Sequence, residues 1–97
     1  MKITGVIWLE VVIEKLDRKH QVSQDEVEEV FGNAPTFMKM QKGHFHGEDV
    51  YRALGQTEAG RYLTVFFIYK STKEALILSA RDMDQKERKN YAKHAQK

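Results

Sequence analysis

The sequence predicts an α+β fold: a single domain over residues 1–97 in the order β-α-α-β-β-β-β-α, with a central antiparallel sheet flanked by an N-terminal helix pair and a C-terminal helix. Three segments predict this class. Residues 62–69, Tyr-Leu-Thr-Val-Phe-Phe-Ile-Tyr, are apolar on both faces, as expected of a central strand. Residues 23–31 carry the start signal and the apolar stripe of a helix. Residues 76–91 pass from an apolar, alternating strand directly into a polar, basic helix.

The N-terminal part predicts a short strand followed by a first helix. Residues 3–8 are mostly apolar and β-branched, which indicates the strand. Residues 10–20 form the helix, and His20 continues the helical stripe of the apolar residues Leu9, Val12, Ile13 and Leu16. Gln21 stands where a glycine would end the helix more comfortably, so we expect a small local cost in free energy there.

The second helix has the clearest start signal in the chain. Ser23 is its cap and Glu26 completes a capping box, while Val22 and Val27 are spaced to form a hydrophobic staple. Residues 32–35, Gly-Asn-Ala-Pro, end this helix. The two helices are therefore expected to form a small hairpin with acidic residues on its outer face.

Four strands are predicted after Pro35, over residues 36–41, 48–56, 61–70 and 74–81. The first of them is ambiguous, because methionine and lysine fill its centre. Short loops join the last three strands as hairpins, which gives an antiparallel meander. The helix pair and the last helix must cover the two faces of this sheet.

The last strand is expected to alternate, with Leu76, Leu78 and Ala80 on one face, and Ile77, Ser79 and Arg81 on the other. It ends at Arg81, and the last helix begins at once, with Asp84 as its cap and Glu87 in the position of a capping box. A guanidinium on a rigid strand end, beside the free N–H groups of a helix, is well placed to bind phosphate. In the alternative interpretation, Arg81 pairs with Asp82, Asp84 or Glu87 and only holds the helix in place.

Composition bounds the class of protein. The chain has 97 residues, 41% hydrophobic and 31% charged, which is typical of a globular domain. No apolar run approaches the roughly 20 residues needed to cross a bilayer, and the N-terminus does not have the pattern of a signal peptide. The absence of cysteine excludes disulfides and thiolate zinc sites. We therefore expect a cytoplasmic protein that does not associate with a membrane.

Charge is distributed unevenly although the net charge is only +2. Basic residues gather after residue 81 and around residues 15–20, whereas residues 25–29 are acidic. Such a division suits a polyanion on one side and a basic partner on the other. The plainer interpretation is that these are solvated helix faces.

Several motifs occur along the chain in a recognisable order: Trp8, then Arg18-Lys19-His20 with Val22, Phe31, then His44, Gly47 and Glu48, then Gly55, Gly60-Arg61, and finally Ser79-Ala80-Arg81, Glu87-Arg88 and Tyr91. With them the chain resembles, over nearly its whole length, the BrnT family of toxins. Three positions depart from the pattern: Leu9 replaces an aspartate, Gln21 a glycine, and Val50 the arginine of a Glu-x-Arg element.

The resemblance implies a RelE-like fold and a ribonuclease toxin of a type II toxin–antitoxin system, which cuts RNA without a metal ion or other cofactor and inhibits translation. It also implies a cognate antitoxin, similar to BrnA, which covers the site and contacts promoter DNA. The assembly would be a homodimer or a toxin–antitoxin heterotetramer. The loss of an arginine at Val50 bears on cleavage efficiency rather than on the fold.

Metal-free RNA cleavage requires a base for the 2′-hydroxyl, an acid for the leaving 5′-oxygen, and cations for the charge on phosphorus. Arg61 and Arg81 are the predicted catalytic cations, because they lie at strand ends that meet at one edge of an antiparallel hairpin. His20 is the candidate for proton transfer. Glu48 is either a base or a residue that orients an arginine. The predicted RNA-binding residues are Lys19, His44, Arg88 and Tyr91.

Each of these residues has a structural alternative. His20 fits a packed helix face, Tyr91 fits a core position, and Arg61 fits a surface ion pair with Glu58. Trp8 is interpreted as an anchor of the core or of an interface. His44 and His46 form a His-x-His pair that could bind a divalent ion with Glu48 or Asp49, but it lacks a defined third ligand, and no metal site is predicted.

Three classes of function are consistent with the sequence. The first is a ribonuclease toxin. The second is a nucleic-acid-binding module on the same fold, catalytically weak because Val50 replaces an arginine. The third is a protein-interaction domain that uses the acidic second helix and exposed aromatic residues.

Overall fold

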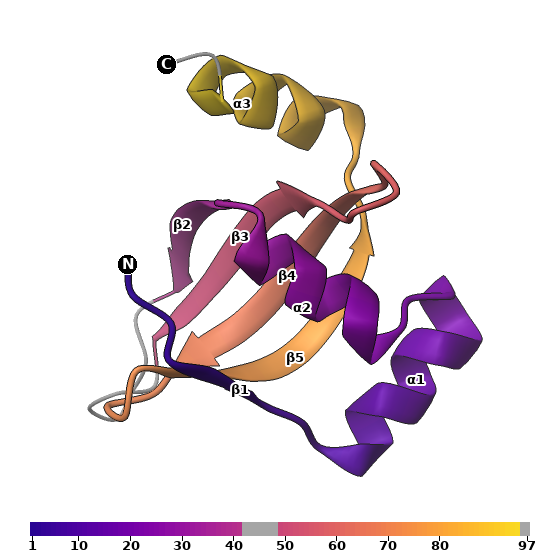
Figure 1. Cartoon of the computed structure of the whole chain (residues 1–97), viewed down its shortest axis with the longest axis vertical. Coiled ribbons are helices and arrows are strands. Elements are labelled where there is room, and N and C mark those ends of the chain that lie inside the picture. The colour runs from indigo at the N-terminus through magenta and orange to yellow at the C-terminus, as the bar shows by residue number, and fades with distance from the viewer. Residues whose placement is uncertain (42–48, 96–97) are drawn as a thin grey trace.

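The computed structural model describes residues 1–41 and 49–95. These residues form three helices and a five-stranded sheet, in the predicted order along the chain (Figure 1). The elements are β1 Gly5–Ile7, α1 Glu10–His20, α2 Gln24–Gly32, β2 Thr36–Gln41, β3 Val50–Gln56, β4 Tyr62–Tyr69, β5 Glu74–Asp82 and α3 Gln85–Ala95. The α+β class and the bounds of the first helix are confirmed. The first strand is shorter than the predicted range 3–8.

The sheet has the strand order β1-β5-β4-β3-β2. Strands β2 to β5 pair antiparallel with their neighbours, as predicted, and β4 is the central strand. Strand β1 pairs in parallel with β5, from Gly5 opposite Glu74 to Ile7 opposite Leu76, so the sheet as a whole is mixed. This central position explains why the sequence of β4 is apolar on both faces of the strand.

The predicted alternation along β5 is wrong beyond its middle. Phe66 pairs with Ser79 and Phe67 pairs with Ile77, so Leu78 is an extra residue in a β-bulge. The bulge shifts the alternation by one residue, and Ala80 is therefore buried in the core together with Ile77. Arg81 consequently lies on the face opposite Ile77 and Ala80, whereas the regular alternation placed it on the same face as Ile77.

The main core lies between the sheet and the first two helices. In Figure 1, α2 crosses one face of the sheet and α1 packs beside β5. The fully buried side chains in this layer include Leu16, Val27, Val30, Val65 and Phe67. Trp8 packs against the same cluster, and its Nε1 donates to Glu28 Oε2 at 3.1 Å, which agrees with its interpretation as an anchor.

The third helix covers the other face less fully than predicted. It packs against β2 and β3, and Figure 1 shows it at the end of the sheet where β4 begins and β5 ends. Farther along this face, Phe66, Ile68 and Leu76 stay partly exposed. The reason lies in the sequence of α3, whose few apolar residues give it little surface to bury.

Local signals explain the helix ends. Ser23 Oγ accepts the Glu26 N–H at 3.2 Å and Glu26 Oε1 accepts the Ser23 N–H at 3.1 Å, which confirms the predicted capping box of α2. Gln21 ends α1 with φ 50°, in the left-handed region where a glycine would be less strained. Leu9 is the N-cap of α1 and provides no side-chain hydrogen bond to it.

Among the described residues, no helix has both the length and the apolar character needed to span a membrane.

Candidate functional site

Two clusters of charged residues meet at the edge of the sheet where β4 begins and β5 ends. Arg81 and Asp82 are consecutive on β5, so their side chains leave the strand on opposite faces. Asp82 faces the helix pair and binds Arg61, while Arg81 faces α3 and binds Glu87. The predicted meeting of both arginines at one edge is therefore present, but they lie on its two sides.

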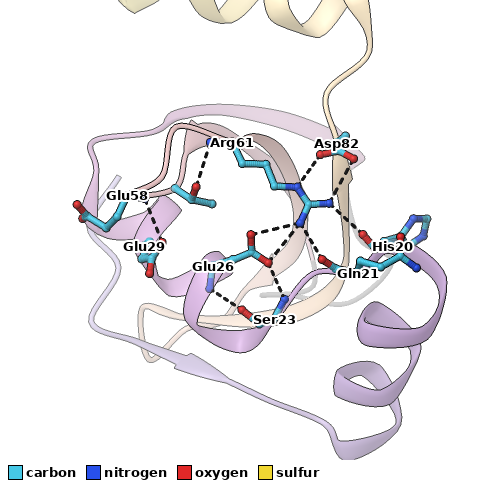
Figure 2. Close-up of polar contacts among 9 residues, drawn as sticks. His20, Gln21, Ser23, Glu26, Glu29, Glu58, Arg61 and Asp82 are labelled. Atoms are coloured by element: carbon cyan, nitrogen blue, oxygen red, sulfur yellow. Dashed lines mark hydrogen bonds and ion pairs between the residues drawn. The ribbon is translucent and has the colours of Figure 1, made fainter.

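Arg61 forms a clamp between the helix pair and the sheet (Figure 2). Its Nε and Nη2 donate to the Asp82 carboxylate at 2.8 and 3.2 Å, and its Nη1 donates to Glu26 Oε2 at 3.2 Å. Nη1 also donates to the Gln21 carbonyl at 2.7 Å and Nη2 to the His20 carbonyl at 3.0 Å. These contacts use all five N–H groups of the guanidinium.

The contacts of this clamp stabilise the charged forms of both Arg61 and Asp82. The hydrogen bond to Asp82 raises the pKa of Arg61, and the bond from Arg61 lowers the pKa of the Asp82 carboxyl. The nearby charge of His20 also lowers the pKa of Asp82. The alternative of an ion pair with Glu58 is wrong: the carboxylate partners of Arg61 are Glu26 and Asp82, and Glu58 instead donates its backbone N–H to Glu29 Oε1 at 3.0 Å.

His20 and Lys19 end α1 next to this clamp. The His20 side chain is partly buried and Lys19 is exposed. Cations in the last helical turn are favoured by the helix dipole, so this end of α1 is a stable place for positive charge. Through its carbonyl oxygen, His20 is attached directly to Arg61.

On the other side, one buried carboxylate binds two arginines. Glu87 is 3% exposed. Arg81 donates Nη1 to its Oε1 at 2.7 Å and Nη2 to its Oε2 at 2.9 Å, a bidentate pair. Arg52, on β3, donates Nη1 to the same Oε2 at 3.1 Å. The prediction that Arg81 can pair with Glu87 and hold the last helix in place is thus met by the geometry.

Glu87 also completes the start of α3. Its Oε1 accepts the Asp84 N–H at 3.0 Å, and Asp84 Oδ1 accepts the Glu87 N–H at 2.8 Å, which is the expected capping box. Burial alone would raise the pKa of Glu87, but the hydrogen bonds from Arg81 and from the Asp84 backbone lower the pKa to about 2. The carboxylate is therefore charged at any pH near neutral.

An aromatic shelf lies beside this pair. Arg88 stacks on the ring of Tyr62 with its Cζ 4.1 Å from the ring centre, and the Tyr91 ring meets Tyr62 edge to face at 6.0 Å. The Tyr91 hydroxyl donates to Gln56 Oε1 at 3.4 Å. Arg88 is exposed, whereas Tyr91 is partly buried and helps to attach α3 to the sheet.

The structure thus brings the predicted residues into two groups. Arg61, His20 and Lys19 lie on the α1 side, and Arg81, Arg88 and Tyr91 lie on the α3 side. Asp82 joins the groups, because its carboxylate binds Arg61 while its carbonyl accepts Arg81 Nη1 at 3.1 Å. The remaining predicted residues, Glu48 and His44, fall outside the described residues, as does His46.

For a metal ion, the described residues offer no group of three or more His, Asp or Glu side chains. The basic residues on both sides of this edge suit phosphate groups, and the Tyr62 and Tyr91 rings beside Arg88 on the α3 side suit the bases of a nucleic acid.

Arg52 is the residue of this site that sequence analysis missed. It lies two residues after Val50 and therefore on the same face of β3, so the period of a strand was the signal that could have found it. Its partner Glu87 is 35 residues away in the chain, which no local pattern reveals.

The comparisons with protein families and with solved structures both found matches. The family model described as "Ribonuclease toxin, BrnT, of type II toxin-antitoxin system" matches residues 8–87. A crystal structure of the Brucella abortus ribonuclease toxin, BrnT, is similar to this chain with a TM-score of 0.58 and 16% sequence identity, over 87% of this chain and 100% of that chain. Such identity shows a shared fold alone, and the RelE-like label stays a prediction. No curated protein matches.

Proposed function

The chain belongs to the BrnT family of ribonuclease toxins of type II toxin–antitoxin systems, and from this we propose that it cuts RNA without a metal ion and so inhibits translation. The observation that carries the proposal is the position of the family match. It runs from Trp8 to Glu87 and so contains the Arg61 clamp and the Arg81–Glu87 pair at the edge of the sheet, while Arg88 and Tyr91 follow directly after it.

The proposed reaction is transfer of the phosphate to the neighbouring ribose oxygen. The 2′-hydroxyl loses its proton to a base and attacks phosphorus, the bond to the 5′-oxygen breaks, and an acid protonates that oxygen. The products are a 2′,3′-cyclic phosphate and a 5′-hydroxyl end. Negative charge grows on the phosphate oxygens in the transition state, where a fixed guanidinium lowers the barrier.

Arg81 is the cation best placed for this role. Its side chain is 35% exposed, and its hydrogen bonds in the described part of the chain use Nη1 and Nη2, with Glu87 and the Asp82 carbonyl as acceptors. A phosphate arriving from solvent can reach it. His20, on the other side of the same sheet edge, would transfer the proton, because an imidazole can both accept and donate one.

The hydrogen bonds of Arg61 favour a positioning role for this residue rather than contact with the phosphate. All five of its N–H groups are occupied, so it has none to offer to a phosphate without breaking the clamp. It fixes the end of α1 through the His20 carbonyl and thereby holds His20 and Lys19 next to the sheet edge. Glu48 and His44 remain proposed as a base or orienting residue and as an RNA contact, respectively.

The family implies an antitoxin as partner. We propose that it inhibits the toxin by covering the sheet edge that holds Arg81 and Arg88, since RNA and inhibitor would then compete for the same cations. The RNA that the free toxin cuts would be cytoplasmic.

The test is cleavage of a labelled RNA by purified protein in EDTA, beside the Arg81→Ala variant. We expect the parent to cut and the variant to lose roughly 100-fold or more in rate, as for the loss of a main transition-state contact. The matched control is Lys39→Ala. This variant removes an exposed cation on β2 that pairs with Asp49, and it should cut like the parent. Equal cutting by Arg81→Ala and the parent, with both folded by circular dichroism, would remove Arg81 from the site.

A further inference from the structure

The proposed reaction does not explain the position and the hydrogen-bond partners of the Arg52 side chain. The side chain is 20% exposed, and its Nη1 donates to Glu87 Oε2 at 3.1 Å. Its Nε, however, is buried and has no hydrogen-bond partner among residues 1–41 and 49–95. A buried N–H of a charged group without an acceptor is costly in free energy. A ligand with more acceptor atoms than a carboxylate would relieve this cost.

The geometry around Glu87 resembles an occupied anion site. Arg52 Nη1 and Arg81 Nη2 converge on one atom, Oε2, at 3.1 and 2.9 Å. Two guanidiniums face a single carboxylate, so the trio carries one excess positive charge. A phosphate group brings negative charge together with a wider set of acceptor oxygens, and paired guanidiniums suit such a group well.

The strand positions make this pair rigid. Arg52 lies on β3 opposite Phe66, and Arg81 lies on β5 opposite Thr64, so both arginines flank the central strand β4. The Arg81 guanidinium also lies 5.3 Å from the centre of the Phe66 ring. Cations held on a sheet need little reordering when a ligand arrives.

From these contacts we propose that Arg52 and Arg81 together bind one phosphate group of single-stranded RNA, in the place that the Glu87 carboxylate occupies in the free protein. Glu87 then acts as an internal competitor for the phosphate. This inference rests on the proposed function, since it assigns the RNA backbone as the ligand of that site.

Helix α3 can release Glu87 without leaving the sheet. Tyr91 contacts Tyr62 and Gln56, and Arg88 stacks on Tyr62, and none of these contacts uses the Glu87 side chain. When the carboxylate turns away, the Asp84 N–H that it now accepts becomes free at the start of α3. That N–H can then donate to the bound anion.

The test measures binding separately from cleavage. The probe is a fluorescently labelled 2′-O-methyl RNA oligonucleotide, which has no free 2′-hydroxyl to attack phosphorus, and the readout is anisotropy over a series of salt concentrations. Arg52→Gln should weaken binding about tenfold or more. It should also lower the slope of log affinity against log salt by about 0.7, the value for one lost phosphate contact on a single strand. Lys39→Gln is the matched control, because it removes an exposed cation from β2.

A second variant, Glu87→Gln, should change the affinity for RNA in the opposite direction. Loss of the competing charge should tighten binding of the same oligonucleotide by about tenfold, whereas a merely structural Glu87 would leave affinity unchanged or reduce it. Unchanged affinity and salt slope in folded Arg52→Gln would overturn the proposal. If Arg52→Gln does not fold, Glu87→Gln decides: tighter binding supports the proposal and unchanged or weaker binding overturns it.

Failure of the inference and failure of the proposed function give different results. A parent protein that binds the oligonucleotide through Arg52 but does not cut ordinary RNA would support this phosphate site and contradict the proposed ribonuclease activity. A parent that cuts RNA while Arg52→Gln binds and cuts equally well overturns the phosphate site alone. A parent that binds no RNA overturns both.

Discussion

Arg61 joins the end of α1 and the start of α2, which are neighbours in the sequence, to the end of β5, which lies far from them along the chain. Its planar guanidinium serves two carboxylates and two carbonyls at once. An ammonium has three donors on a flexible stem and cannot reproduce this fork.

Arg61→Lys should therefore destabilise the protein although it keeps the charge. We expect a loss of roughly 2 kcal/mol in the free energy of unfolding, since several charge-assisted hydrogen bonds are lost at a partly exposed site. Urea denaturation measures it, with the exposed Arg18→Lys on α1 as the control, expected within about 0.5 kcal/mol of the parent. A variant as stable as the parent would contradict the clamp.

Glu87 predicts a pH dependence of stability. Its pKa in the folded protein is about 2, below the ordinary value of 4.5. A carboxyl with a lowered pKa contributes stability that is fully present above pH 4.5 and is lost as the pH falls from 4.5 towards 2. The full effect corresponds to roughly 3 kcal/mol.

The free energy of unfolding of the parent, measured in denaturant between pH 2 and 6, should therefore fall steeply on the acid side. Glu87→Gln should have a clearly flatter acid limb than Glu14→Gln, which changes an exposed glutamate on α1. Identical acid limbs in these two variants would show that Glu87 does not carry the effect.

At the scale of elements, α2 and β3 approach each other closely at Gly55. A Cβ added there would lie 2.9 Å from Val30 Cγ1 and 3.2 Å from Pro35 Cβ, closer than packed atoms allow. Gly55→Ala should thus force the helix away from the sheet and cost about 1–3 kcal/mol.

Gly32, at the last position of α2, is the matched control. A Cβ there meets no atom within 4 Å. Alanine should be neutral or stabilising by up to about 1 kcal/mol at this helical position. Thermal unfolding of Gly55→Ala, Gly32→Ala and the double variant Val30→Ala/Gly55→Ala tests the contact, because smaller side chains at position 30 should relieve part of the strain. No difference between the two single variants would contradict it.

The elements could be predicted well where their signals are local. The capping box fixes the start of α2, and the pattern of residues 10–20 gives the bounds of α1 as observed. The bulge in β5 could not be predicted, because it depends on how that strand pairs with β4. The parallel pairing of β1 with β5 likewise joins segments about 70 residues apart.

Across the whole molecule, the sequence indicated candidate residues for the site, but it indicated few of the contacts between them. Arg81 and Glu87 are six residues apart, so their pairing was open to a local argument. Arg61 with Glu26, and Arg52 with Glu87, are each 35 residues apart and meet only when the sheet forms. The division of the arginines between a clamp and an accessible pair depends on the opposite directions of consecutive side chains at the end of β5.

If this chain cuts RNA by means of the ribose 2′-hydroxyl, each cut depends on the hydroxyl of the nucleotide on the 5′ side of the bond. The most direct measurement uses an RNA that the protein cuts in EDTA, and the same RNA with one 2′-deoxy nucleotide on the 5′ side of the cut bond. We expect products with 2′,3′-cyclic phosphate and 5′-hydroxyl ends from the first RNA, and no cut at that bond in the second. Cutting at the deoxy nucleotide, or products with 5′-phosphate ends, would contradict this mechanism.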